Sequence, residues 1–356
     1  MGVADFEEVL AKKRDIVWPV IKRYLDDLID FPNFCKISSK YVSITKFHQE
    51  IVAEYPERKG KYLRPTLVLL TAEAMGNPST KAILTAAAMQ ASEDWLLIHD
   101  DIEDDSSQRR GAPTLHRLYG KELAINAGDT VHLIMWKILW DNRKVLGSEL
   151  ASKIADEFYQ MLMRTVFGQT VEIKWTQDNR QGLMDEDIFL LLDGKTSYYT
   201  IAGPMRLGAI LAGATEKQLV EIYEFGKVLG RAFQIVDDLL DLTSDFKGLK
   251  KQTGNDIYEG KRTIMLAHLF RAIRGEDKKK LLAIMKKNRG TKTGNEVKWV
   301  IEMMDKYGSL EYGRKLAEKF AQEAENIFER KLKFLKQEPA RSQIKAGIDF
   351  IVKREY

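Results

Sequence analysis

The 356-residue sequence has little of several features that mark particular classes of protein. Its single cysteine, Cys35, excludes a disulfide framework and favours a reducing compartment, and we expect this lone thiol to be buried. Every apolar run is far shorter than the roughly 20 residues of a membrane-spanning helix. The start of the chain, "MGVADFEEVLAKKRD", lacks the apolar core of a signal peptide. We therefore expect a cytoplasmic protein.

Neither sign of charge dominates the chain. It has 56 Lys and Arg residues against 52 Asp and Glu, a net charge of +4. A dedicated nucleic-acid-binding protein carries an excess of basic residues on one face, so we do not expect nucleic acid as a partner. The apolar fraction of 44% is sufficient for a large buried core.

Proline is also scarce, with eight in the chain, and the long stretches between prolines repeat apolar residues every three or four positions. This spacing predicts an all-α fold, because strands would alternate with a period of two. Helices are expected at 6–31, where Pro19 would kink or break the helix, and at 64–75, 80–105, 122–143, 147–176, 185–194, 197–213, 216–243, 262–273, 294–305 and 309–335. No linker rich in serine or proline divides the chain, so we predict one domain over residues 1–356.

Acidic residues are concentrated in two segments, "DDIED" at 100–104 and "DDLLD" at 237–241. Each segment ends an apolar helical stretch. The first and fifth residues of such a motif lie about one turn apart on the same face of a helix. A run of acids is commonly no more than a solvated helix face, but two copies on apolar helices favour paired cation sites.

The two motifs offer oxygen ligands without nearby histidine or cysteine. Such ligands favour a hard cation, and Mg²⁺ in particular is held by one or two carboxylates together with phosphate oxygens. Calcium is less favoured because the sequence has no twelve-residue calcium-loop pattern, and a di-iron site is less favoured because Glu-x-x-His pairs are missing. We therefore predict magnesium bound together with phosphate groups.

Basic residues accompany the acids in glycine-containing segments, where they are suited to binding phosphate. These residues are Lys61, Arg64, Arg109, Arg110, Lys195, Lys251 and Lys261. Taken singly, each is better explained as a surface charge. Their grouping near the two acidic motifs predicts a site for a polyanion.

At these residues the sequence resembles the trans-isoprenyl diphosphate synthases of the polyprenyl synthetase family, over most of its length. The matching segments follow the family order: "GKYLRP" at 60–65, "DDIEDDSSQRRGAPTLH" at 100–116, "AGD" at 127–129, "GQ" at 168–169, "KTS" at 195–197, "FQIVDDLLD" at 233–241 and "GNDIYEGKRT" at 254–263. The resemblance implies a helical bundle around a deep central cavity, in a homodimer. It also implies an enzyme that joins isopentenyl diphosphate to an allylic diphosphate.

The resemblance further implies roles for residues at matching positions. The ligands of the Mg²⁺ ions, expected to number three, would be Asp100, Asp104 and Asp237, supported by Asp101, Asp238 and Asp241. The allylic diphosphate would be held by Arg109, Lys195 and Lys261, and isopentenyl diphosphate by Lys61, Arg64 and Arg110. Lys251 would lie on a closing loop, and Thr196 and Gln234 would face the developing carbocation.

Two positions depart from the family pattern. The usual "GGKRxRP" is "KGKYLRP" here, with Lys59 in place of glycine and Tyr62 in place of arginine. Seven residues before the first aspartate, where relatives have His or Gln on the second diphosphate, this chain has Glu93. A carboxylate there would repel a diphosphate unless it were protonated or paired.

The length of the product should depend on the residues below Asp100 on the same helix. Leu96 and Ser92 lie one and two turns down from Asp100, at about 6 and 12 Å. Trp95 is the bulkiest residue available, and in the family an aromatic side chain at this position shortens the product. We predict geranylgeranyl diphosphate (C20), and next farnesyl diphosphate (C15), although Trp95 could simply pack in the core.

Two other functions compete with this interpretation. A terpene cyclase or a head-to-head synthase would use similar aspartate motifs but would not need the basic segments for a second diphosphate. A non-catalytic partner subunit would keep the fold, although such subunits often lose one aspartate motif, and both are intact here.

Overall fold

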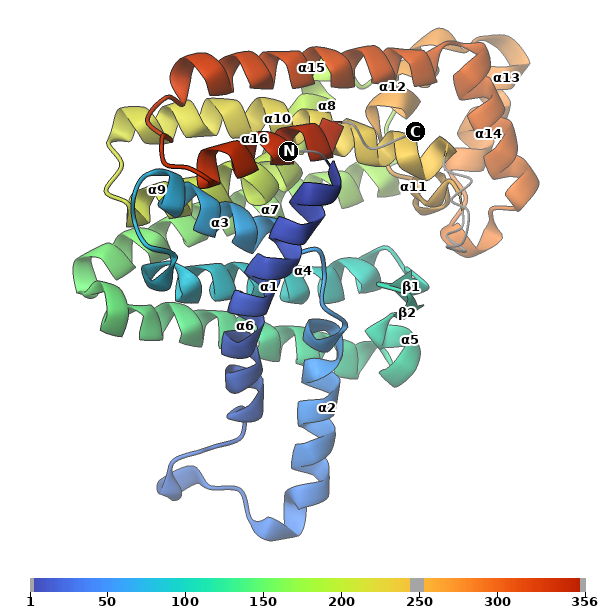
Figure 1. Ribbon diagram of the computed structural model, residues 1–356. Coiled ribbons are helices and arrows are strands. Elements are labelled where there is room, and N and C mark those ends of the chain that lie inside the picture. The colour runs from blue at the N-terminus through green and yellow to red at the C-terminus, as the bar shows by residue number, and fades with distance from the viewer. Residues whose placement is uncertain (1–2, 244–252, 353–356) are drawn as a thin grey trace.

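The computed structural model describes residues 3–243 and 253–352, which are mostly helical (Figure 1). The first half contains α1 (Val3–Asp26), α2 (Val42–Arg58), α3 (Leu63–Ala74), α4 (Ile83–Glu103), α5 (Leu115–Tyr119), α6 (Lys121–Leu146) and α7 (Ser148–Gln177). A short antiparallel hairpin, β1 (Gln108–Arg109) and β2 (Ala112–Pro113), follows α4. Single 3₁₀ turns occur at Asn33–Cys35, Ser39–Tyr41 and Ser79–Lys81.

The second half is helical as well. It contains α8 (Asp185–Leu192), the π-helical segment η4 (Asp193–Ala202), α9 (Gly203–Leu211), α10 (Glu216–Thr243), α11 (Asn255–Glu259), α12 (Ile264–Ala272), α13 (Gly275–Met285), α14 (Gly294–Lys306), α15 (Ser309–Lys331) and α16 (Ala340–Val352). A 3₁₀ turn at Arg289–Thr291 precedes α14. The prediction of an all-α fold is confirmed.

Most expected helices lie within a few residues of the observed bounds, but three expectations were wrong or incomplete. Pro19 does not break α1, which runs from Val3 to Asp26. The segments predicted as separate helices at 185–194 and 197–213 form one continuous helical rod, from Asp185 to Leu211, with a π-helical centre. Helices α2, α5, α11, α13 and α16 were not predicted.

Long helices lie side by side in the body of the molecule, with α15 and α10 stacked on one side and α4 and α6 on the other (Figure 1). Helix α7 and segment η4 pack between these pairs. Buried apolar side chains form two clusters, one around α10, α12 and α15 and the other around α4, α6 and α7. The carboxyl ends of α4 and α10, which carry the two acidic motifs, are therefore held by separate parts of the core.

Segment η4 packs unusually closely against α10. A Cβ atom on Gly230 would lie 2.4 Å from Cα of Ser197, and one on Gly226 would lie 2.5 Å from Cα of Ala202. Because only glycine leaves room for this approach, these two positions fix η4 against α10. A π-helical segment inside an α-helical rod is common at functional sites.

Helix α1 and helix α2 extend from the body as a hairpin, joined by the loop that contains Cys35 (Figure 1). Cys35 is exposed there, so the expectation of a buried thiol was wrong. The side chain lies in a 3₁₀ turn beyond the reach of either core cluster. Among residues 3–243 and 253–352, none of the helices combines the length and apolar character needed to cross a membrane.

Candidate functional site

The first acidic motif occupies the end of α4, where Asp100 and Asp104 remain one helical turn apart. The amide of Asp104 donates to the carbonyl of Asp100 at 2.9 Å, which continues the helical hydrogen bonding past Glu103. Asp104 accepts from Nζ of Lys261 at 2.7 Å. Asp100 accepts from Nε2 of Gln169 at 3.2 Å and lies 3.6 Å from Nζ of Lys195. The predicted pair therefore faces cationic and amide groups from three other segments.

Asp101 points in a different direction and is fully buried. Its carboxylate accepts from the Tyr55 hydroxyl at 2.6 Å and from Nη2 of Arg109 at 2.5 Å. Nε of Arg109 also donates to the same carboxylate, at 3.0 Å. Asp101 therefore positions Arg109 rather than facing Asp100 and Asp104.

The second acidic motif lies near the end of α10, and its three aspartates have different environments. Asp237 is exposed, whereas Asp238 is buried and accepts from Nε2 of Gln234 at 2.7 Å. Asp241 accepts from the backbone amide of Asp256 at 3.0 Å, at the start of α11. Asp237 and Asp241 have the same spacing as Asp100 and Asp104, but their own surroundings differ from each other.

Lys195 on η4 and Lys261 after α11 face acids of the first motif. Lys195 donates to Glu172 of α7 and faces Asp100. Lys261 pairs with Asp104 and also with Glu259, at 2.7 Å. The lysines therefore neutralise acids that would otherwise repel one another across the site.

Burial and neighbouring charges shift the pKa values of several of these acids. Burial, with the charges of Asp100 and Glu259, raises the pKa of Asp104 to about 7. Burial, with the charges of Asp237 and Glu172, raises the pKa of Asp238 to about 8. Although burial opposes the change, the nearby Lys195, Lys261 and Arg109 lower the pKa of Asp100. Such a cluster of carboxyl groups is suited to additional cations.

The donor chemistry fits a hard divalent ion. The groups available are carboxylate and amide oxygens, with neither imidazole nor thiolate among them. In the part of the chain that the structure describes, no three His, Cys, Asp or Glu side chains are already gathered closely enough to hold an ion. Lys195 and Lys261 pair with the acids of the first motif.

The sequence interpretation assigned no role to four polar residues of this region: Gln169, which lies in the quoted "GQ" segment, and Glu172, Asp256 and Glu259. Asp256 is half-buried, and desolvation with the charges of Asp238 and Asp241 raises its pKa well above the ordinary range. The helical spacing of Gln169 and Glu172 on α7 would have indicated a shared face. Asp256 and Glu259 lie inside the quoted "GNDIYEGKRT" segment, in which only Lys261 had been singled out.

A hydrogen-bonded chain joins η4 to the second motif. Oγ1 of Thr196 donates to Oε1 of Gln234 at 3.0 Å, and the amide nitrogen of Gln234 donates to Asp238. The side chains of Thr196 and Gln234, predicted to lie together, are therefore adjacent. Their orientation is set by Asp238.

Glu93, the departure from the family pattern, lies between two of the predicted phosphate-binding residues. Its carboxylate is 3.1 Å from Nη1 of Arg64 and 3.6 Å from Nη2 of Arg110. Glu93 is thus paired with both arginines.

The two remaining predicted phosphate-binding lysines lie elsewhere. The Nζ atom of Lys61 is 5.6 Å from the ring centre of Phe350 on α16. Lys251 is outside the described residues.

The residues expected to control product length lie on two sides of α4. Ser92 is buried, and its hydroxyl lies 2.9 Å from that of Tyr199 on η4. Leu96 is half-buried on the same helical face as Asp100. The indole of Trp95 instead faces α6, where it stacks on His132 with ring centres 4.0 Å apart. His132 was not singled out in the sequence.

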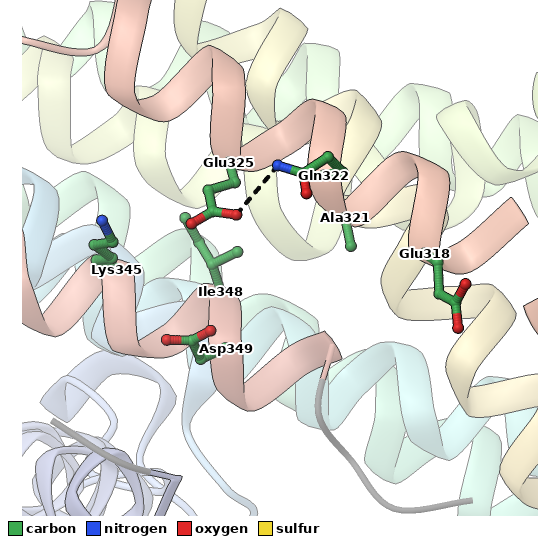
Figure 2. A pocket seen from close by; sticks show the side chains of 7 residues that line it. All are labelled: Glu318, Ala321, Gln322, Glu325, Lys345, Ile348 and Asp349. Atoms are coloured by element: carbon green, nitrogen blue, oxygen red, sulfur yellow. Dashed lines mark hydrogen bonds between the residues drawn. The ribbon is translucent and has the colours of Figure 1, made fainter. Parts of the chain in front are cut away.

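A separate groove lies between α15 and α16 (Figure 2). It is lined by Glu318, Ala321, Gln322, Glu325, Lys345, Ile348 and Asp349. Its lining includes none of the aspartates of the two motifs, and Gln322 and Glu325 hydrogen-bond to each other across 3.4 Å. The groove is therefore distinct from the candidate site.

Comparisons with known proteins show the family to which this chain is similar. Residues 45–304 match the family model described as Polyprenyl synthetase. A short chain isoprenyl diphosphate synthase of Methanothermobacter thermautotrophicus is 31% identical over 297 residues, covering 83% of this chain and 87% of that protein. A geranylgeranyl diphosphate synthase of Sulfolobus acidocaldarius is 34% identical over 265 residues, covering 74% of this chain and 78% of that protein. The crystal structure of geranylgeranyl pyrophosphate synthetase from Pyrococcus horikoshii Ot3 has a TM-score of 0.81 at 28% identity, covering 99% of this chain and 100% of that chain.

Proposed function

This chain belongs to the polyprenyl synthetase family, and from that premise we propose that it condenses isopentenyl diphosphate with an allylic diphosphate to make geranylgeranyl diphosphate. It is a prenyltransferase of the short-chain class. Farnesyl diphosphate is the next candidate product.

The proposal rests on one observation: the first motif lies against Lys261, whose charge also acts on the second motif. Asp104 of α4 accepts a hydrogen bond from Lys261, and the Lys261 charge also acts on Asp238 of α10. Two acidic helix ends that share a counter-charge form a single electrostatic site. Such a site supports binding of a diphosphate together with metal ions.

We assign Asp100, Asp104 and Asp237 as ligands of Mg²⁺, three ions in all. Bound Mg²⁺ would stabilise the negative charge that collects on the departing diphosphate. Asp101 acts indirectly, because it holds the Arg109 guanidinium beside Asp100. Asp238 likewise orients Gln234.

The basic residues of this chain would divide between the two substrates. Arg109, Lys195 and Lys261 are placed to hold the allylic diphosphate, since each already contacts an acid of the first motif. Arg64 and Arg110, with Lys61, would hold isopentenyl diphosphate. Fixed donors at both diphosphates would align the alkene with the allylic carbon and avoid a bimolecular encounter.

Thr196 and Gln234 would face the cation formed when the allylic bond breaks. Their oxygen dipoles can stabilise positive charge, and the amide of Gln234 is prevented from rotating by its bond to Asp238. The apolar surroundings would exclude water, which would otherwise convert the cation into an alcohol.

The experiment is to incubate the purified chain with Mg²⁺, isopentenyl diphosphate and a C5, C10 or C15 allylic primer, and to identify the product by mass spectrometry. We expect C20 as the main product and no product in EDTA. Asp100→Asn and Asp237→Asn should each lower kcat by at least about 100-fold. Asp277→Asn on α13, which replaces an exposed acid, is the matched control.

Each competing function predicts a different result. Consumption of an allylic diphosphate without isopentenyl diphosphate would indicate a cyclase or a head-to-head synthase. Turnover that appears only after a second synthase is added would indicate a partner subunit. Either result would overturn the proposal.

A further inference from the structure

Glu93 lies where the second diphosphate is proposed to bind, and it already uses the groups that would bind it. Its two carboxylate oxygens lie 3.1 Å from Nη1 of Arg64 and 3.6 Å from Nη2 of Arg110. All three side chains are largely buried, with exposed fractions of 20%, 13% and 13% for Arg64, Arg110 and Glu93. Solvent screening of these charges is therefore weak.

A second acid completes the neutralisation of the arginines. Asp94 is 1% exposed and accepts from Nη1 of Arg110 at 2.8 Å and from Nε2 of Gln90 at 3.2 Å. Two guanidinium groups thus face two carboxyl groups, and little positive charge is left over for a polyanion. This differs from the allylic side, where magnesium would add positive charge.

The same cluster retains buried polar atoms that lack hydrogen-bond partners in the described part of the chain. They are the donors Oη of Tyr62, Nε of Arg64 and Nη2 of Arg110 and the acceptors Oε1 of Gln90, Oε2 of Glu93 and Oδ2 of Asp94. Buried donors without partners are costly, and a bound group rich in acceptors would satisfy them. The cluster is therefore suited to such a group, provided that Glu93 gives way.

We propose that Glu93 is an internal competitor for the second diphosphate: its carboxylate occupies guanidinium groups of Arg64 and Arg110 that isopentenyl diphosphate must take over. The inference rests on the proposed function. It makes Glu93 a determinant of affinity for this substrate alone, because Glu93 is seven residues, about 10 Å along α4, from Asp100.

The test compares wild type with Glu93→Gln, which keeps the size of the side chain but removes its charge. We expect the KM for isopentenyl diphosphate to fall by about ten-fold, while kcat and the KM for the allylic substrate stay within two-fold. Glu93→Ala should also lower the KM for isopentenyl diphosphate. This second variant keeps the inference testable if Glu93→Gln folds poorly. Glu329→Gln, which removes the charge of a distant acid paired with Arg341 and Lys345, should leave all three constants unchanged.

Binding without turnover provides the second readout. Calorimetric titration of isopentenyl diphosphate in EDTA samples mainly this cluster, because the allylic side then lacks the Mg²⁺ ions that would help it to bind a diphosphate. We expect about ten-fold tighter binding to Glu93→Gln than to wild type. Unchanged or weaker binding by Glu93→Gln would overturn the inference. If neither protein condensed the substrates, the proposed function would fail, while the calorimetric difference would still decide the role of Glu93.

Discussion

The indole of Trp95 is stacked on the imidazole of His132, with ring centres 4.0 Å apart and ring planes 18° apart. Trp95 is on α4, five residues before Asp100, and His132 is on α6, so the two rings bridge neighbouring helices. Trp136, one turn along α6, donates from its indole nitrogen to Nε2 of His132 at 2.8 Å. The position of Trp95 is thus fixed by a partner from another helix.

This stack predicts that both rings limit product length. Trp95→Ala removes the bulk proposed to stop the growing prenyl chain, so products longer than C20 are expected. His132→Ala leaves the indole in place without its stacking partner, so a mixture of C20 and longer products is expected. Mass analysis of products from isopentenyl diphosphate and a C15 primer measures the change.

Trp299→Ala on α14 is the control for loss of an indole elsewhere, and its product should stay at C20. If Trp95→Ala also gave only C20, Trp95 would be a packing residue and some other side chain would set the length.

The second prediction concerns the contact between α7 and the segment that carries Lys195. A Cβ atom on Gly168 would lie 2.8 Å from the backbone nitrogen of Lys195 and 3.0 Å from its Cα. Gly168→Ala should therefore displace η4, lowering kcat by about ten-fold and the free energy of unfolding by about 1–3 kcal/mol.

Gly290→Ala is the matched control, because a Cβ atom there meets no other atom within 4 Å. Steady-state kinetics and urea denaturation measure both effects. Wild-type kinetics for Gly168→Ala would show that the position of η4 tolerates the extra methyl group.

The third prediction is a pH dependence of stability that arises from Asp94. Burial, with the charge of Glu93, raises the pKa of Asp94 from 3.8 to about 6 despite its bond to Arg110. The folded state then binds this proton more tightly than the unfolded chain does, so the contribution of Asp94 to stability increases as the pH falls from about 6 toward 4.

Asp94→Asn removes the titrating group. The free energy of unfolding of wild type minus that of Asp94→Asn should be about 1 kcal/mol larger at pH 5 than at pH 7. Urea denaturation of both proteins at the two pH values measures this difference. A difference that is independent of pH would contradict the assignment.

The fourth prediction concerns the homodimer, which we propose forms through the outer faces of α6 and α7. Leu133 and Trp140 on α6 are 67% and 60% exposed, and Met163 and Phe167 on α7 are 53% and 54% exposed. These helices are neighbours, so their exposed apolar side chains form one surface. Apolar surfaces of this kind are commonly buried between the subunits of a dimer.

Leu133→Glu places a charge on this surface and should convert the dimer to a monomer, as measured by light scattering at micromolar concentration. Val220→Glu changes an equally apolar, 54% exposed residue of α10 and should leave the dimer intact. A wild-type protein that is monomeric, or a Leu133→Glu variant that remains dimeric, would show that α6 and α7 are not the interface.

Local patterns predicted much of the fold and half of the site. Apolar periodicity predicted the helices that carry Asp100 and Asp237, because that periodicity is a property of each helix alone. The spacing of the first motif likewise predicted that Asp100 and Asp104 share a face. It could not predict that Asp101, one residue on, is buried against Tyr55 and Arg109, since what lies beside each face depends on other helices.

The sequence by itself determined an all-helical chain, two acidic helix ends and a set of basic residues suited to diphosphates, because each follows from residue type and helical spacing. Tertiary structure alone decided that Lys261 pairs with Asp104, that His132 meets Trp95 and that Glu93 pairs with Arg64. These contacts join residues between 29 and 157 positions apart, as for Lys261 and Asp104. The strength of these contacts depends on burial and on which helix faces meet. Neither can be read from a single segment of the sequence.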